Sequence, residues 1–177
     1  MSDTTVQTSL DLVDIISKLV IPFFIAALTA KFSTKFALNK FYKEKWWEKR
    51  LEAFTEIINI AYRIKMSNDY FLSCEYAKME PGESRFKPHP KEIEEKLQAE
   101  YWLDLQELER IAQLADFTLT TKVKSILDAY VNARKKMMDD WYDDAIESFD
   151  ASEKDLSLSE KLLSDLVAEA QRELKIN

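Results

Sequence analysis

The chain has 177 residues, about the size of one domain, and 46% of them are apolar, enough for a hydrophobic core. It contains one glycine and four prolines, fewer chain-reversing residues than a turn-rich β fold needs, so we expect an all-α fold. The single cysteine, Cys74, excludes an internal disulfide and a cysteine-based zinc site, and the single histidine, His89, excludes histidine-pair metal motifs. Because a glycine-rich phosphate loop is also excluded, no cofactor and no metal are expected.

Charge is distributed unevenly along the chain, whose formal net charge is −7. Residues 31–50, the basic block, hold seven basic and two acidic side chains. Residues 139–155, the acidic run, hold eight acidic side chains and one lysine. An acidic protein with one basic block is not typical of nucleic-acid binders, so no direct nucleic-acid binding is expected. The acidic run indicates a solvated surface or a docking surface for a basic protein partner.

An uncharged run, LVIPFFIAALTA, covers residues 19–30. A helix over residues 10–30 would be about 31 Å long, which matches a hydrocarbon layer about 30 Å thick. Its charges, Asp11, Asp14 and Lys18, share one helical stripe because three and four residues separate them. Such a stripe is tolerated in a membrane where it faces a water-filled lumen or another subunit. We therefore expect a single span in a homo-oligomer, with a pore-lining or subunit-contact set of Asp11, Asp14, Lys18, Ile21 and Ile25.

The basic block follows the apolar run directly. The positive-inside rule then predicts a single-pass inner-membrane protein with its N-terminus outside and its C-terminus in the cytoplasm. The lysines expected at the surface of the membrane lipids are Lys31, Lys35, Lys40, Lys43 and Lys45. Two other interpretations stay open: a helix buried in a partner or a dimer core, and an amphipathic helix that lies on the membrane.

The rest of the chain predicts an up-and-down helical bundle. No glycine or proline interrupts residues 23–80, so one helix is expected to run from the membrane segment to about Lys78. We expect the domains to be a membrane-spanning helix, 1–35, and a cytoplasmic bundle, 36–177. An apolar seam in this first helix contains Trp47, Leu51, Phe54, Ile58 and Ala61.

Three more helices are expected, and the short connections between them imply antiparallel neighbours. Pro90 suits the first turn of the second helix. The third helix is expected to start near Thr118–Thr121. The capping-box pattern Ser157-x-x-Glu160 predicts the start of the fourth.

Arg85 and His89 lie in a proline-rich segment, residues 80–90, which is the chief expected loop. They are similar to the Arg and His pair of HEPN ribonucleases, in which the two residues stand further apart in the sequence. In those enzymes the His activates a ribose hydroxyl and the Arg stabilises the phosphate. Arg85 and His89 are therefore the candidate catalytic residues, with a solvated loop as the alternative interpretation. A lone His with no visible partner base favours a protein that is not an enzyme.

The segment LVIPFFIAALTA, the basic flank KFYKEKWWEKR and the helical remainder together resemble the small accessory membrane protein of type VI-B CRISPR systems. The resemblance implies an oligomeric membrane pore with a HEPN-like cytoplasmic bundle. It also implies a role in bacterial anti-phage defence as accessory to an RNA-guided nuclease, by permeabilising or depolarising the inner membrane. Two alternatives stay open: a membrane-tethered HEPN-type ribonuclease, and a non-catalytic membrane adaptor that recruits a partner through its acidic face.

Overall fold

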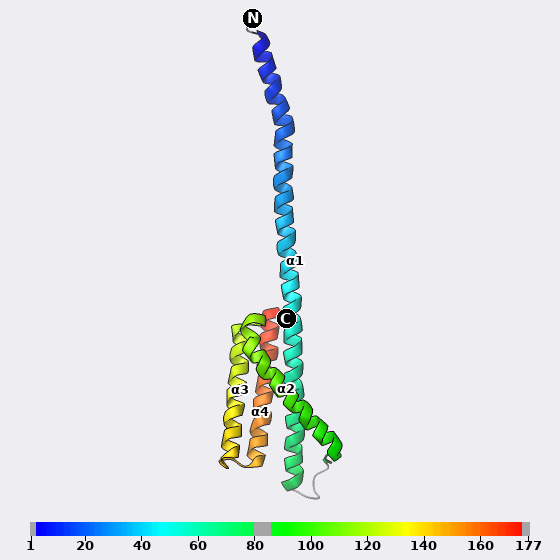
Figure 1. The fold of residues 1–177 in the computed structure, drawn as a ribbon, viewed down its shortest axis with the longest axis vertical. Helices are drawn as coiled ribbons and strands as arrows, with labels where there is room; N and C mark the ends of the chain where they lie inside the picture. Colours follow the sequence, from blue (N-terminus) through cyan, green and yellow to red (C-terminus); the bar gives the residue numbers. More distant parts are fainter. Residues whose placement is uncertain (1–2, 80–85, 175–177) are drawn as a thin grey trace. The chain divides into compact units, whose positions relative to one another are not determined.

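The computed structural model describes residues 3–79 and 86–174, and the side chains of residues 3–22, Ile25, Ala27 and 116–118 lie outside the described part. The elements are α1 (Asp3–Met79), α2 (Lys91–Thr118), α3 (Thr121–Tyr142) and α4 (Ser148–Leu174) (Figure 1). All regular structure within the described residues is helical, so the expected all-α class is confirmed and the chain forms a four-helix bundle.

The chain divides into two compact units, Met1–Trp47 and Glu48–Asn177. The division therefore lies further along α1 than the expected boundary at position 35. The exposure of the side chains explains the position, because all of those from Lys31 to Lys49 are exposed. Among the described side chains of α1, the first one buried in the core is Phe54, which is 1% exposed.

The core of the second unit draws apolar side chains from all four helices. Ile57 of α1, Leu108 of α2 and Leu127 of α3 are completely buried, and so is Leu166 of α4. Burial of such a side chain contributes about 1.5–3 kcal/mol to stability, so this shared core holds the bundle together. In Figure 1, α3 and α4 run side by side, and α2 crosses the bundle obliquely.

Local sequence signals explain most helix ends. The first helix ends at Met79, close to the expected Lys78. Pro90 precedes the second helix, and its carbonyl oxygen accepts hydrogen bonds from the backbone N–H groups of Ile93 and Glu94. Thr120 caps the third helix, because its hydroxyl oxygen accepts a hydrogen bond from the backbone N–H of Val123 at 3.1 Å.

Two expectations about these elements are wrong. Helix α4 begins at Ser148, so Ser157 lies in its interior and caps no helix. Trp47, expected in the apolar seam, is 46% exposed. The buried seam of α1 begins later: Phe54 and Ala61 lie in the core as expected, and Ile57 and Ile64 join them. Leu51 and Ile58, also expected in the seam, are partly buried against this core.

The turn between α3 and α4 ends α3 with a Schellman motif. The backbone N–H of Ala145 donates to the carbonyl of Asp140 at 2.8 Å, and that of Asp144 donates to the carbonyl of Trp141 at 3.2 Å. Asp144 adopts a φ of 55°, and it is the one non-glycine residue with positive φ in the described part of the chain.

Candidate functional site

The described side chains of residues 23–47 form an exposed aromatic and basic segment of α1. Its aromatic side chains are largely accessible to solvent, and Phe36 is 81% exposed. They are interspersed with the lysines expected at a membrane surface, which are also exposed: Lys31, Lys35, Lys40, Lys43 and Lys45. One of these lysines, Lys40, lies 3.8 Å from Glu44 on the next turn. A helix that exposes both large aromatic rings and cationic side chains has the chemistry of a surface that contacts lipid headgroups.

The expected pore-lining set lies outside the described side chains: Asp11, Asp14, Lys18, Ile21 and Ile25. Most of the expected span over residues 10–30 falls in that same region. Within the part of the chain that the structure describes, no helix combines the length and the apolar character needed to cross a membrane.

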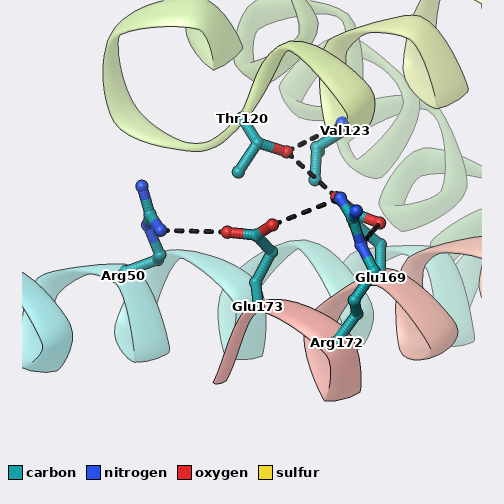
Figure 2. Close-up of polar contacts among 6 residues, drawn as sticks. All are labelled: Arg50, Thr120, Val123, Glu169, Arg172 and Glu173. Atoms are coloured by element: carbon teal, nitrogen blue, oxygen red, sulfur yellow. Dashed lines mark hydrogen bonds and ion pairs between the residues drawn. The ribbon is translucent and has the colours of Figure 1, made fainter. Parts of the chain in front are cut away.

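A polar cluster joins three helices at one end of the bundle (Figure 2). Arg50 of α1 donates from Nη1 to Oε2 of Glu173 near the end of α4, at 3.0 Å. Glu173 also accepts from Arg172 at 3.2 Å. Arg50 and Glu173 retain side-chain exposures of 26% and 22%, so their attraction is only partly screened by water.

The inner half of the same cluster surrounds a buried carboxylate. Glu169 is 6% exposed and accepts two hydrogen bonds from the guanidinium of Arg172, at 2.9 and 2.6 Å. The hydroxyl of Thr120, which caps α3, also donates to Glu169 at 3.4 Å. These contacts compensate the cost of burying the charge and fix the last turns of α4 against the start of α3.

His89 lies beside α1 in the segment that precedes α2, and its ring stacks on that of Tyr70 with centroids 4.7 Å apart. The backbone N–H of His89 donates to the Tyr70 hydroxyl at 2.8 Å, and that hydroxyl donates to Glu94 at 2.7 Å. Burial and the bond to Glu94 raise the pKa of Tyr70. These contacts anchor the loop, and Arg85 lies outside the described residues.

Two open cavities flank Tyr70 and Phe86. The first, of about 570 Å³, is lined in part by Cys74 and Glu94. The second, of about 620 Å³, is lined in part by His89. Both lie in the size range of small-molecule sites.

A second buried polar network joins α2, α3 and α4. Arg134 of α3 lies 3.5 Å from Asp155 of α4, and both side chains are close to nine-tenths buried. The hydroxyl of Tyr101 on α2 donates to Asp155 at 2.8 Å. The guanidinium carbon of Arg134 also lies 5.6 Å from the centroid of the Tyr101 ring. Burial raises the pKa of Asp155, although Arg134 and Tyr101 oppose the shift.

The sequence alone did not predict that Asp155, unlike the rest of the acidic run, would be buried and paired with Arg134. The other acidic residues of 139–155 are mostly exposed, and Asp140 lies 3.9 Å from Lys154. The signal that distinguishes Asp155 is the position of Arg134, a charged residue within the otherwise apolar seam of α3, which requires a buried counter-charge.

Within the described residues, no group of three or more His, Cys, Asp or Glu side chains is arranged to hold a metal ion. Comparison of the chain with known protein families, curated proteins and solved structures finds no match.

Proposed function

We propose that the protein is a membrane-associated homo-oligomer whose N-terminal helix forms a pore in the bacterial inner membrane. The observation that carries the proposal is the exposed aromatic and basic segment of α1, residues 23–47. Leaving many large rings in water is costly, and a lipid surface or neighbouring copies of the same helix remove that cost. The lysines among these rings suit anionic headgroups on the cytoplasmic side.

The pore itself is proposed from the sequence of the preceding turns. Asp11, Asp14 and Lys18 share one stripe with Ile21 and Ile25, and in a ring of helices they would form charged collars above an apolar constriction. The N-terminus would then lie outside, and the bundle would lie in the cytoplasm as a HEPN-like domain. The resemblance to type VI-B accessory proteins supports a role in anti-phage defence beside an RNA-guided nuclease.

This activity requires no catalytic residue. His89 supports a non-enzymatic role, because its backbone and ring hold the loop against Tyr70. A membrane adaptor that docks a partner on the acidic run is the function that replaces the pore if the next experiment fails.

The test is leakage from vesicles that contain the reconstituted full chain. We expect wild type to release an entrapped dye and to dissipate a potassium diffusion potential. Ile25→Asn should increase the leak, because a polar side chain hydrates an apolar constriction. Asp11→Lys combined with Asp14→Lys should change ion selectivity.

The matched control is Leu103→Asn, at a side chain of α2 that is 64% exposed. It introduces the same polar group far along the chain and should leave the leak unchanged. Tight vesicles with both wild type and Ile25→Asn would contradict the pore and favour the adaptor.

A further inference from the structure

Three buried polar atoms at and beside the Arg134–Asp155 contact lack a hydrogen-bond partner within the described part of the chain. They are Nε of Arg134, Oδ1 of Asp155 and the hydroxyl oxygen of Tyr130. Tyr130 is only 5% exposed, and it lies one turn before Arg134 on the same face of α3. Burial and the negative charge of Asp155 raise the pKa of Tyr130, so its hydroxyl lies within electrostatic reach of that carboxylate.

The side chains that surround this contact do not satisfy these atoms. Nε of Arg134 lies 3.5 Å from Oδ1 of Asp155, beyond the usual length of an N–H···O hydrogen bond, about 2.7–3.2 Å. Tyr101 donates its one hydroxyl hydrogen to the other oxygen of Asp155, Oδ2, at 2.8 Å. The same hydroxyl accepts from Nη2 of Arg134 at 3.2 Å. A further molecule that both accepts and donates would satisfy the atoms that remain.

The charges at the contact select the class of that molecule. Arg134 and Asp155 balance each other, so an anion would be repelled by the carboxylate and a cation by the guanidinium. A small neutral molecule with donors and acceptors avoids both penalties, and water is the smallest of these. Two hydrogen bonds of about 2.8–2.9 Å can join one water oxygen to two atoms that are 3.5 Å apart.

We propose that an ordered water molecule accepts a hydrogen bond from Nε of Arg134 and donates one to Oδ1 of Asp155, with the Tyr130 hydroxyl as its third partner. Three protein partners are typical of a buried structural water. An open cavity of about 200 Å³, which Asp155 lines together with Asn68 and Ser148, gives water a route to the carboxylate. The water completes the link between α3 and α4, and this inference does not depend on a membrane.

The experiment is magnetic relaxation dispersion of water oxygen-17 in solutions of the detergent-solubilised full chain, which counts long-lived bound waters. Wild type should hold one more such water than Arg134→Met combined with Asp155→Leu, because apolar side chains offer it no partner. The matched control is Lys161→Met combined with Asp165→Leu. It removes an ion pair of α4 whose side chains are 72% and 41% exposed, and should keep the wild-type count.

The conservative variant Tyr130→Phe tests the third partner independently of that double variant. A hydroxyl bonded to the water stabilises the fold, so its removal should lower the equilibrium constant for folding about fivefold. A buried hydroxyl without a partner only costs desolvation, and its removal would raise that constant. Tyr62→Phe, at a side chain that is 52% exposed, is the control and should leave the constant unchanged.

Equal water counts in wild type and the Arg134 and Asp155 double variant would overturn the site, because they would show that the two side chains meet directly. A Tyr130→Phe variant more stable than wild type would overturn the three-partner arrangement. Neither outcome bears on the proposed pore, since both measurements concern the bundle alone.

Discussion

Asp144 occupies a backbone conformation that glycine adopts without a steric cost. Its φ of 55° places it in the left-handed region, at the position where the Schellman motif favours glycine. We expect Asp144→Gly to raise the free energy of unfolding by about 0.5–1 kcal/mol, because it removes strain and one charge from the acidic run. Chemical denaturation followed by circular dichroism measures the change. Asp143→Gly is the control: it also removes one charge from the acidic run, but at a φ of −85° it relieves no strain. Equal stabilisation by both variants would contradict the role of the backbone conformation.

Arg134 and Asp155 stabilise the bundle only as a pair. Removal of either partner leaves the other charge in the core, so Arg134→Met and Asp155→Leu should each lower the free energy of unfolding by about 3 kcal/mol. The double variant leaves no buried charge from this pair and should recover most of that loss. Urea denaturation of the three variants measures the coupling. Additive losses would show that the two side chains act independently.

The buried carboxyl of Asp155 also gives the bundle a pH dependence of known sign. Its pKa is raised in the folded state, so the folded protein holds this proton more tightly than the unfolded chain. The stability it contributes is fully present below the unfolded pKa near 4 and is lost as pH rises through the folded value. The difference in stability between wild type and Asp155→Asn should therefore become less favourable to wild type as pH rises across that window. A difference that does not vary with pH would contradict this.

Among the elements, the helix boundaries with a proline or a threonine cap were predictable, and the start of α4 was not. Pro90 directly precedes α2, where the fixed φ of proline suits the start of a helix. Thr120 directly precedes α3, and its hydroxyl oxygen accepts a hydrogen bond from the backbone N–H of Val123. Ser157-x-x-Glu160 matches the capping-box sequence pattern, yet it lies in the interior of α4. The preceding residues make the difference, because Ala151 is already buried and requires helical structure before Ser157. The packing of an apolar helix face that begins before Ser157 therefore decides where α4 starts, and the capping-box pattern does not.

This contrast between a true cap and an internal serine is measurable. Thr120→Ala removes the bond to the Val123 N–H and the bond to Glu169, so we expect a loss of about 1–2 kcal/mol in the free energy of unfolding. Thr120→Ser keeps a hydroxyl and should retain most of the stability. Ser157→Ala should be neutral or slightly stabilising, because alanine is the better helix former. If Ser157→Ala were as damaging as Thr120→Ala, Ser157 would have to cap a helix.

At the scale of the whole molecule, hydrophobic periodicity predicted the four helices but not where the bundle begins. Trp47 fits the heptad spacing of Leu51 and Phe54, and spacing alone does not reveal whether other helices reach that far along α1. The structure places Trp47 at the end of the first compact unit. Likewise, Glu173 was predictable as helical but not as the partner of Arg50, because 123 residues separate them in the sequence. Contacts across such distances depend on the packing of the helices, which the sequence pattern leaves open.

Because the core residues identified in the bundle run from Phe54 to Leu174, residues 48–177 should fold without the first unit. We expect this fragment to unfold cooperatively, with a midpoint within a few degrees of that of the bundle in the full chain, because it retains the shared core and the Arg50–Glu173 contact. The fragment should also be monomeric, while the full chain in detergent has a mass several times 20.7 kDa. Light scattering and calorimetry test both statements. An oligomeric fragment would place the subunit contacts in the bundle, and the exposed aromatic and basic segment would then need an occupant other than a second copy.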